Sequence, residues 1–269
     1  MNKNRFLQVV RWELLLSKRQ IITMALVFFG MVVIPQLLAL ILKQGYSSAA
    51  YTMGIICAIT LSCYLVFGSA NIFGSLKSRQ QRINNFMLPA SSLEKFIARY
   101  LILIIAMPLA AVAGFLSGDI VQWLVSRMVS SNAAEWATGS FISQVGGENG
   151  FLQFTSSING TVAGTAALVV GALSQHALFL FFGSIFHKHP VVMAFLAWIG
   201  LGIALTVVGA LAAYALSNFL SGEYTVIIYD YWWQVLYYVV NIALIIFCYW
   251  FAYRRYTRLQ VINNQWINK

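Results

Sequence analysis

The side chains in this sequence that could do acid–base or metal chemistry are few and scattered. Two of its three histidines, His187 and His189, flank Lys188 in a short polar turn, without a nearby carboxylate or cysteine to complete a metal site. The third, His176, stands beside Gln175 in a long apolar run. A hydrogen bond to a neighbouring helix is a simpler interpretation of His176 than a proton relay. We therefore expect no metal site.

The sequence also lacks the common catalytic motifs. It contains no HExxH zinc motif, no GxSxG nucleophile motif and no GxxxxGK[ST] phosphate-binding loop. Its three cysteines lie inside apolar runs, which argues against a disulfide framework. We expect no catalytic residue and no cofactor bound by this chain. If the protein moves a solute uphill, the energy must come from another chain.

Composition places the 269 residues in a membrane. Hydrophobic residues make up 60% and charged residues 9%, against roughly 45–50% and about 25% in soluble domains. This balance excludes a soluble enzyme, a nucleic-acid-binding module and a disordered chain. The apolar runs are long and continuous rather than alternating, which excludes an outer-membrane barrel and predicts an all-α, multi-pass membrane protein in contact with the lipid bilayer.

Six runs are long enough for a helix to span a bilayer, which needs about 20 apolar residues. They cover residues 21–42, 51–73, 96–116, 161–186, 190–216 and 235–253. Pro35 and Pro108 fall inside the first and third runs, where each removes one backbone donor and should kink its helix. The runs predict a single six-helix transmembrane domain over residues 21–253.

Basic residues set the expected orientation, because Lys and Arg collect on the cytoplasmic side. Fifteen of the 17 lie on one side: they are in the N-terminal segment, in the loops after the second and fourth runs, in the tail 254–269 and, in the case of Arg99, just inside the third run. Only Lys43 and Arg127 fall on the other side, together with five of the seven acids. The net charge of +10 therefore predicts two cytoplasmic termini, and no nucleic-acid partner.

Two segments should form outer features. Residues 117–160 read as a long outer loop, with Gly-Gly and Ser-Ser turn signals. Residues 217–234 are unusually apolar for a loop and predict a short re-entrant element. Small residues in the fourth run, from Gly160 to Gly171, are spaced for close helix packing.

The N-terminal residues 1–20 suggest a separate helix lying in the inner membrane interface before a turn into the first span. Phe6, Val10 and Leu14 recur at positions i, i+4 and i+8, while basic and polar residues occupy another face. A basic start that merely flanks the first span is the alternative.

The cytoplasmic loop 74–96 carries both basic and apolar residues. Ile83, Phe86, Met87 and Leu88 would be unnecessary in a merely solvated loop. Pro89 disfavours helix at Leu88, and the S-x-x-E spacing at residues 91–94 forms a capping box that should start the next helix. The pattern predicts a helix over residues 75–87, a sharp break and a new capped helix. A capped connecting loop with no partner is the alternative.

This loop carries a family resemblance. The stretch MLPASSLEKF at residues 87–96 resembles the "lPaSslEkf" segment of one branch of the bacterial type-2 ATP-binding-cassette (ABC) exporter permeases, and the order of interfacial helix, six spans and inside termini is similar as well. The resemblance implies that the ATPase subunit docks on the interfacial helix and on this loop. It also implies six contact residues: Arg79, Arg82, Asn85, Leu88, Ser91 and Glu94.

Taken with the resemblance, the sequence predicts the membrane subunit of an ABC transporter, most simply an exporter, in the bacterial cytoplasmic (inner) membrane. It would pair with a second copy or a related permease, and ATP would bind on separate cytoplasmic ATPase subunits. Uncharged polar residues would line the solute path; the candidates are Asn71, Gln175, His176 and Asn241. The alternative is a non-transporting anchor, sensor or assembly subunit that binds a partner through the same loop. A small intramembrane enzyme is a third interpretation, weakened by the missing nucleophile and metal ligands.

Overall fold

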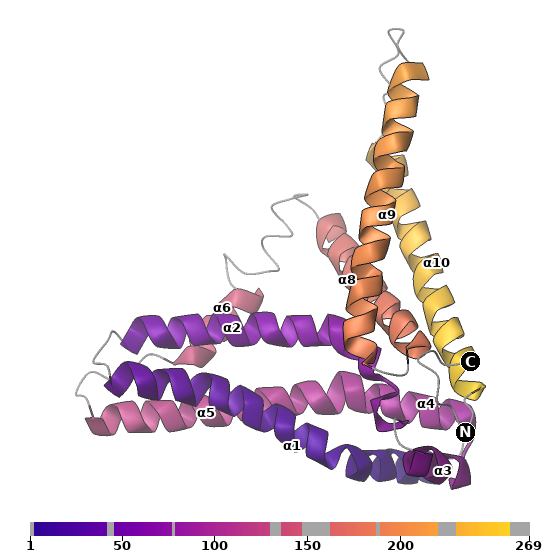
Figure 1. The fold of residues 1–269 in the computed structure, drawn as a ribbon. Helices are drawn as coiled ribbons and strands as arrows, with labels where there is room; N and C mark the ends of the chain where they lie inside the picture. The colour runs from indigo at the N-terminus through magenta and orange to yellow at the C-terminus, as the bar shows by residue number, and fades with distance from the viewer. Residues whose placement is uncertain are drawn as a thin grey trace. The chain divides into compact units, whose positions relative to one another are not determined.

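The computed structural model describes residues 3–41, 46–76, 79–129, 136–146, 162–186, 189–219 and 230–258, and these are almost entirely helical. The chain divides into two compact units. The first comprises residues 1–68 and 86–169, and the second comprises residues 69–85 and 170–269. Each unit is described separately (Figure 1).

The first unit is built on two long helical rods that run side by side. One is α1 (Lys3–Ile41), and the other is α4 (Ser92–Leu101) continued by the π-helical turn η3 (Ile102–Ala106) and α5 (Met107–Val129). The helices α2 (Tyr46–Phe67) and α6 (Ala137–Gly146) pack against each other, and α2 also packs on α1 (Figure 1). A buried cluster joins all four; it consists of Phe28, Val32, Cys57, Ala111, Phe115 and Ala137.

The second unit contains α8 (Val162–Ile185) from Val170 onward, together with α9 (Pro190–Phe219) and α10 (Asp230–Thr257). Two short 3-10 turns, η1 (Gly68–Asn71) and η2 (Gly74–Leu76), lead into α3 (Arg79–Met87), whose end crosses into the first unit. Phe181 of α8 packs against Phe251 of α10, with ring centroids 4.7 Å apart. The indole N–H of Trp198 on α9 donates to Gln175 of α8.

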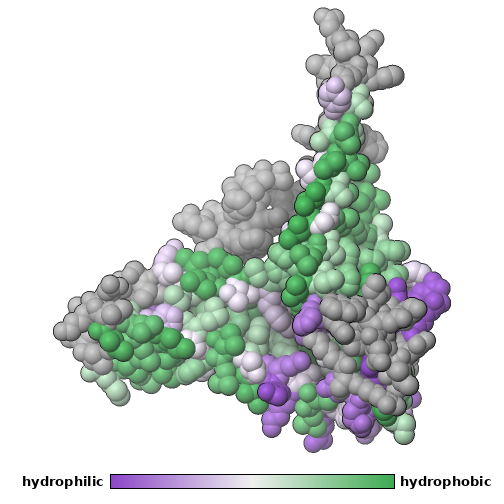
Figure 2. Space-filling model, in the orientation of Figure 1, coloured by the Kyte–Doolittle hydropathy of each residue, from purple (hydrophilic) through white to green (hydrophobic). Residues whose placement is uncertain are grey.

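Five described helices are long and apolar enough to cross a membrane. They occupy the positions of the first, second, third, fifth and sixth predicted spans. The fourth run forms α8, of which the stretch Val169–Ile185 is a shorter apolar helix within the described residues. Apolar side chains cover much of the visible helical surface in Figure 2. The protein is therefore a helical, multi-pass membrane protein by length and composition, as the sequence predicts.

The N-terminal helix differs from its prediction. The structure shows no turn between residues 1–20 and the first span, because α1 runs unbroken from Lys3 to Ile41 and passes Pro35. No glycine, proline or capping motif stands near residue 20 to stop a helix. The segment 3–20 is thus the first half of one rod rather than a separate helix.

A π-helical turn precedes Pro108, where the sequence predicts a kink. The N–H of Met107 bonds to the carbonyl of Ile102, five residues back, so residues 102–106 form a π-turn. A proline cannot supply the next N–H, and its ring crowds the preceding turn. The hydroxyl of Tyr64 on α2 donates to the carbonyl of Leu103, within this turn, at 3.5 Å. The π-turn therefore lies where α2 can contact its backbone.

The described residues of the predicted outer loop 117–160 are largely helical. Residues 117–129 extend α5, and α6 follows in the same segment. Asp119 explains why α6 packs inward: it is fully buried on α5 and accepts hydrogen bonds from the backbone N–H groups of Ala137 and Thr138, at 3.0 and 2.9 Å. The hydroxyl of Thr138 and the side chain of Gln122 also donate to it. A carboxylate from one helix thus caps the start of another.

Replacing Asp119 should therefore release α6. Asp119→Ala leaves buried donors without their acceptor, and we expect it to lower the free energy of unfolding by about 2–3 kcal/mol. Thermal unfolding of the purified protein in mild detergent measures the change. Ser143→Ala is the matched control on α6, because its exposed hydroxyl bonds only to Ser140 of the same helix. Equal stability of the two variants would show that the Asp119 cap does not hold α6.

Two other predictions fall largely beyond the described residues. The re-entrant element predicted over residues 217–234 lies mostly outside them, since α9 ends at Phe219 and α10 begins at Asp230. In the small-residue row of the fourth span, Gly160 is outside them as well. At the other end of the row, the hydroxyl of Tyr237 lies 2.7 Å from the position that a Cβ on Gly171 would take.

Candidate functional site

The chain turns sharply between α3 and α4, and apolar side chains are exposed at this turn. We call residues 86–93 the tip. Met87 is 80% exposed, and Phe86 and Leu93 are about half exposed. The helix α3 ends at Met87, as expected from Pro89. Exposed apolar residues flanked by polar ones are typical of a surface that another molecule covers.

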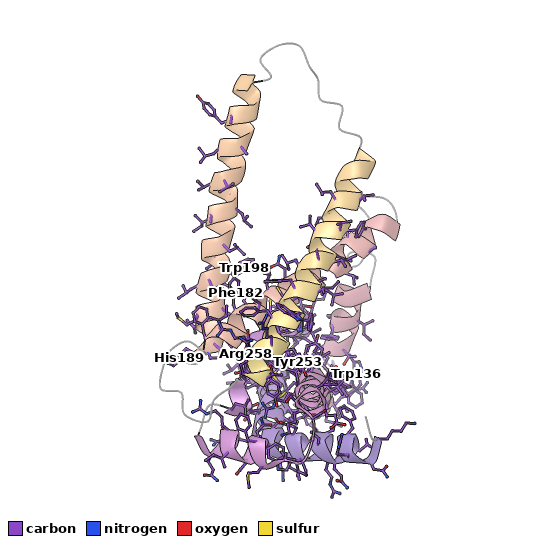
Figure 3. The ribbon with its side chains drawn as sticks, turned by 90° about the vertical axis from the view of Figure 1, so that its right-hand side faces the viewer. Trp136, Phe182, His189, Trp198, Tyr253 and Arg258 are labelled. Carbon is purple, nitrogen blue, oxygen red and sulfur yellow. The ribbon has the colours of Figure 1, made fainter. Side chains whose placement is uncertain are left out.

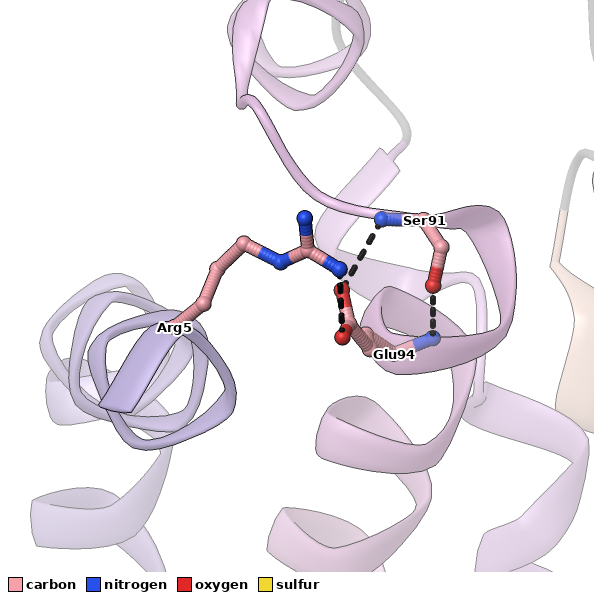
Figure 4. Close-up of polar contacts among 3 residues, drawn as sticks. All are labelled: Arg5, Ser91 and Glu94. Atoms are coloured by element: carbon pink, nitrogen blue, oxygen red, sulfur yellow. Dashed lines mark hydrogen bonds and ion pairs between the residues drawn. The ribbon is translucent and has the colours of Figure 1, made fainter. Parts of the chain in front are cut away.

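The capping box predicted from Ser91 and Glu94 is confirmed. The Ser91 hydroxyl accepts from the Glu94 N–H at 3.2 Å, and the Glu94 carboxylate accepts from the Ser91 N–H at 3.0 Å (Figure 4). This exchange satisfies two backbone donors at the start of α4. The tip is therefore joined to α4 by a fixed helix start.

The same carboxylate connects α4 to α1. Arg5 donates to Glu94 at 2.9 Å, as Figure 4 shows, and the Glu94 side chain is buried. Glu94 precedes the predicted third span, which begins at residue 96. The Arg5 guanidinium, with the backbone N–H of Ser91, holds the pKa of Glu94 below its ordinary value.

Two substitutions separate the roles of Glu94. Glu94→Gln keeps a capping side chain but loses the attraction to Arg5, whereas Glu94→Ala loses both. At pH 7 we expect the melting temperature to fall in the order wild type, Glu94→Gln, Glu94→Ala.

Acid should remove the difference in melting temperature between the wild type and Glu94→Gln. A carboxyl group whose pKa is lower in the folded protein than in the unfolded chain stabilises the fold. This stabilisation is complete above the pKa of the unfolded chain, about 4.3 for glutamate, and it is lost as the pH falls through the pKa of the folded protein. Melting curves of the wild type and Glu94→Gln should therefore converge as the pH drops below 4. A difference that persists undiminished in acid would contradict the role of the ion pair.

A second, more deeply buried ion pair lies two turns further along α1. Arg99 of α4 donates through Nε to Glu13 at 2.7 Å, and the two residues are 4% and 1% exposed. Lys95 is also buried, one turn before Arg99, and interacts electrostatically with Glu13. The carboxylate of Glu13 therefore serves two cations. With Arg5 and Glu94, these residues bind the first half of α1 to α4.

The predicted interfacial face of α1 is only partly covered by the rest of the chain. Phe6 and Val10 are half-buried and Leu14 is partly exposed. The buried row is instead Val9, Glu13 and Ser17. Glu13 of this buried row pairs with Arg99 of α4, whereas the face of Phe6, Val10 and Leu14 stays more accessible.

The contact residues implied by the family resemblance separate into exposed and buried sets. Ser91 is exposed and Leu88 is half-buried, whereas Arg82, Asn85 and Glu94 are buried in the chain itself. Arg79 lies in α3, and its side chain is outside the described residues. The exposed tip residues Phe86, Met87 and Leu93 thus present more surface to a partner than the polar set does.

Asn85 has a structural role in the second unit. Its amide donates to the hydroxyl of Tyr256 on α10 at 3.2 Å, and the Tyr256 ring stacks on Phe73. These contacts fix the segment 69–85 against the C-terminal end of α10.

The four candidate solute-path residues also make contacts within the second unit. Gln175 accepts from Trp198 at 2.6 Å, and Asn241 donates to the carbonyl of Tyr237 in its own helix. His176 is buried, and its backbone carbonyl accepts from Ser69. Asn71 is half-buried, and its amide lies beside Gly74, where a Cβ would meet it at 2.4 Å. The structure brings no pair of the four into a hydrogen bond among the described contacts.

Sequence reasoning missed the partners of Glu13 and Asp119. Asp119 is one of the five acids assigned to the outer side and Glu13 carries no prediction, although each is buried in a helix interface. A signal was present for Glu13: an acid on the apolar side of α1 requires a cation nearby. None was present for Asp119, because its partners are backbone groups of α6.

Among the described residues, no three His, Cys, Asp or Glu side chains gather to hold a metal ion. Comparison of the chain with family models, with curated proteins and with solved structures finds no match in any of the three.

Proposed function

We propose that this chain is the transmembrane subunit of an ABC transporter, most simply an exporter, and that a separate cytoplasmic ATPase docks on its tip. The tip is the main support for this proposal. Phe86, Met87 and Leu93 are exposed at a sharp turn, and the helix that follows, α4, is capped and paired with α1 through Arg5 and Glu94. The resemblance of residues 87–96 to the permease family supports it.

The helical connections suggest how force would travel. The helix α4 continues through η3 into α5 without a loop, forming a rod that is long and apolar enough to cross a membrane. The Arg5–Glu94 and Glu13–Arg99 pairs bind this rod to α1. A push on the tip would therefore move both rods together, as a conformational change driven by ATP closure of the partner requires.

Copurification tests the proposal. The full chain is extracted from its native membrane in mild detergent, and bound proteins are identified and assayed for ATPase activity. Met87→Asp should reduce the bound ATPase at least tenfold, because it puts a charge into an apolar contact. Met128→Asp is the matched control, since Met128 is equally exposed, at 84%, on α5.

Either outcome is informative. A copurifying ATPase with a phosphate-binding loop that is lost in Met87→Asp and retained in Met128→Asp supports the transporter. A partner without nucleotide-binding motifs, or no ATPase under several gentle extractions, would replace the transporter with a membrane anchor or sensor.

A further inference from the structure

The C-terminal end of α10 carries a groove that the proposed transport function does not use. Its volume is about 420 Å³, and its described lining consists of Phe247, Trp250, Phe251, Arg254, Arg255 and Arg258. Small-molecule sites have volumes of about 300–1,000 Å³. These residues follow the spacing i, i+3, i+4, i+7, i+8 and i+11, which places them in one stripe along the helix.

The polarity of this stripe changes along its length. The first three positions are aromatic, and the ring of Phe247 lies 6.1 Å from Phe251 and 6.4 Å from Trp250. The last three are arginines at the end of the apolar stretch Val235–Thr257. Figure 3 shows Arg258 at this end of α10, near Tyr253. An apolar half is thus followed directly by a basic half.

The aromatic rings hold two of the guanidinium groups in place. Arg254 lies over Trp250 at 5.1 Å and Arg255 lies over Phe251 at 5.2 Å. Stacking leaves the edge donors of a guanidinium directed outward, where they can bind phosphate oxygens. The arginines are therefore positioned by the same rings that line the apolar half.

The acid that begins α10, Asp230, precedes Arg254 by about 24 residues, or about 36 Å along a helix. Arginines at a helix C-terminus also interact favourably with its dipole, but this does not account for the aromatic half of the groove. An amphipathic anion would match both the aromatic and the basic half of the groove.

We propose that this groove binds an anionic phospholipid, with its phosphate on Arg254 and Arg258 and an acyl chain along Phe247 and Trp250. In a bilayer, the acyl chains of a phospholipid lie nearer the membrane centre than its phosphate does. The aromatic and basic halves of the stripe follow each other in the same order along α10. Basic pockets at the cytoplasmic ends of membrane helices are suited to such headgroups. The proposal needs only a membrane location and does not rest on the transport function.

Lipid titration of the full chain in an uncharged detergent tests the site. Phosphatidylglycerol and phosphatidylcholine with identical acyl chains are added separately, and the thermal shift and the lipids retained in native mass spectrometry are measured. A ligand that binds only the folded state raises the melting temperature with concentration. Phosphatidylglycerol should bind at least tenfold more tightly than phosphatidylcholine, and added salt should weaken it.

Two variants and two soluble probes complete the test. The double variant Arg254→Gln, Arg258→Gln should lose the preference for phosphatidylglycerol. Arg127→Gln is the matched control, because Arg127 also stacks on a tryptophan, Trp123, at 4.8 Å. Equal binding of both lipids, an unchanged double variant or the same loss in Arg127→Gln would overturn the site. Glycerol phosphate or inorganic phosphate binding as tightly as the lipid would assign the groove to a soluble phosphate instead.

Discussion

Gly114→Ala should separate the two rods of the first unit and leave little folded protein. A Cβ on Gly114 would lie 2.1 Å from the carbonyl oxygen of Ala25 and 2.7 Å from its carbonyl carbon. These are backbone atoms of α1, so no side chain can rotate away. Overpacking of this kind costs about 1–3 kcal/mol or more, because the helices themselves must move. We expect a lower melting temperature and a smaller yield of monodisperse protein in detergent.

The matched control should change stability in the opposite direction. Nothing lies within 4 Å of a Cβ on Gly209 of α9. Alanine favours helix over glycine by about 0.8–1 kcal/mol, so Gly209→Ala should be neutral or stabilising. If Gly114→Ala behaves in the same way, the close contact between α1 and α5 is absent from the folded protein.

A second substitution tests the nature of the clash. Ala25→Gly removes the methyl group of Ala25 but leaves its carbonyl in place, so it should not rescue Gly114→Ala. Gly118, one turn along α5, lies near Phe29 of α1 in the same way, with its Cβ position 3.0 Å from the Phe29 carbonyl oxygen. Gly118→Ala should therefore be milder than Gly114→Ala. Melting temperatures of the three variants establish this order.

The positions of the apolar helices were predictable because membrane burial leaves a compositional signal. Runs of about 20 apolar residues identify spans regardless of their neighbours. The tip was also predictable, since Pro89 and the capping box act within a few residues. Both signals are local, and a single sequence displays them directly.

The contacts between helices were less predictable. The small-residue row of the fourth span was recognised, but the closest backbone approaches described lie elsewhere. They occur at Gly54 against Ala137, Gly114 against Ala25 and Gly183 against Ala70. A glycine in an apolar run does not reveal which helix it faces. The same limitation hid the partner of Glu13, which lies 86 residues away.

Glu13→Gln should be the most damaging of the charge substitutions in the first half of α1. It removes the carboxylate shared by Arg99 and Lys95, both of which are buried. Breaking a buried pair from one side costs about 3–5 kcal/mol, because the remaining charge stays out of water. Arg99→Gln should cost less, since Lys95 remains beside Glu13 to balance its charge. Arg11→Gln on the exposed side of α1 should have little effect.

A double variant distinguishes the pair from simple loss of packing. In Glu13→Leu, Arg99→Leu neither member of the pair remains charged, and buried apolar replacements of an ion pair are often neutral. We expect its melting temperature to lie above that of Glu13→Gln, although Lys95 then remains buried without the Glu13 carboxylate. If the double variant is as unstable as the sum of the two single variants, the pair contributes no coupling energy. The binding of α1 to α4 would then depend on apolar contacts, and a push on the tip would reach α1 through packing rather than through these charges.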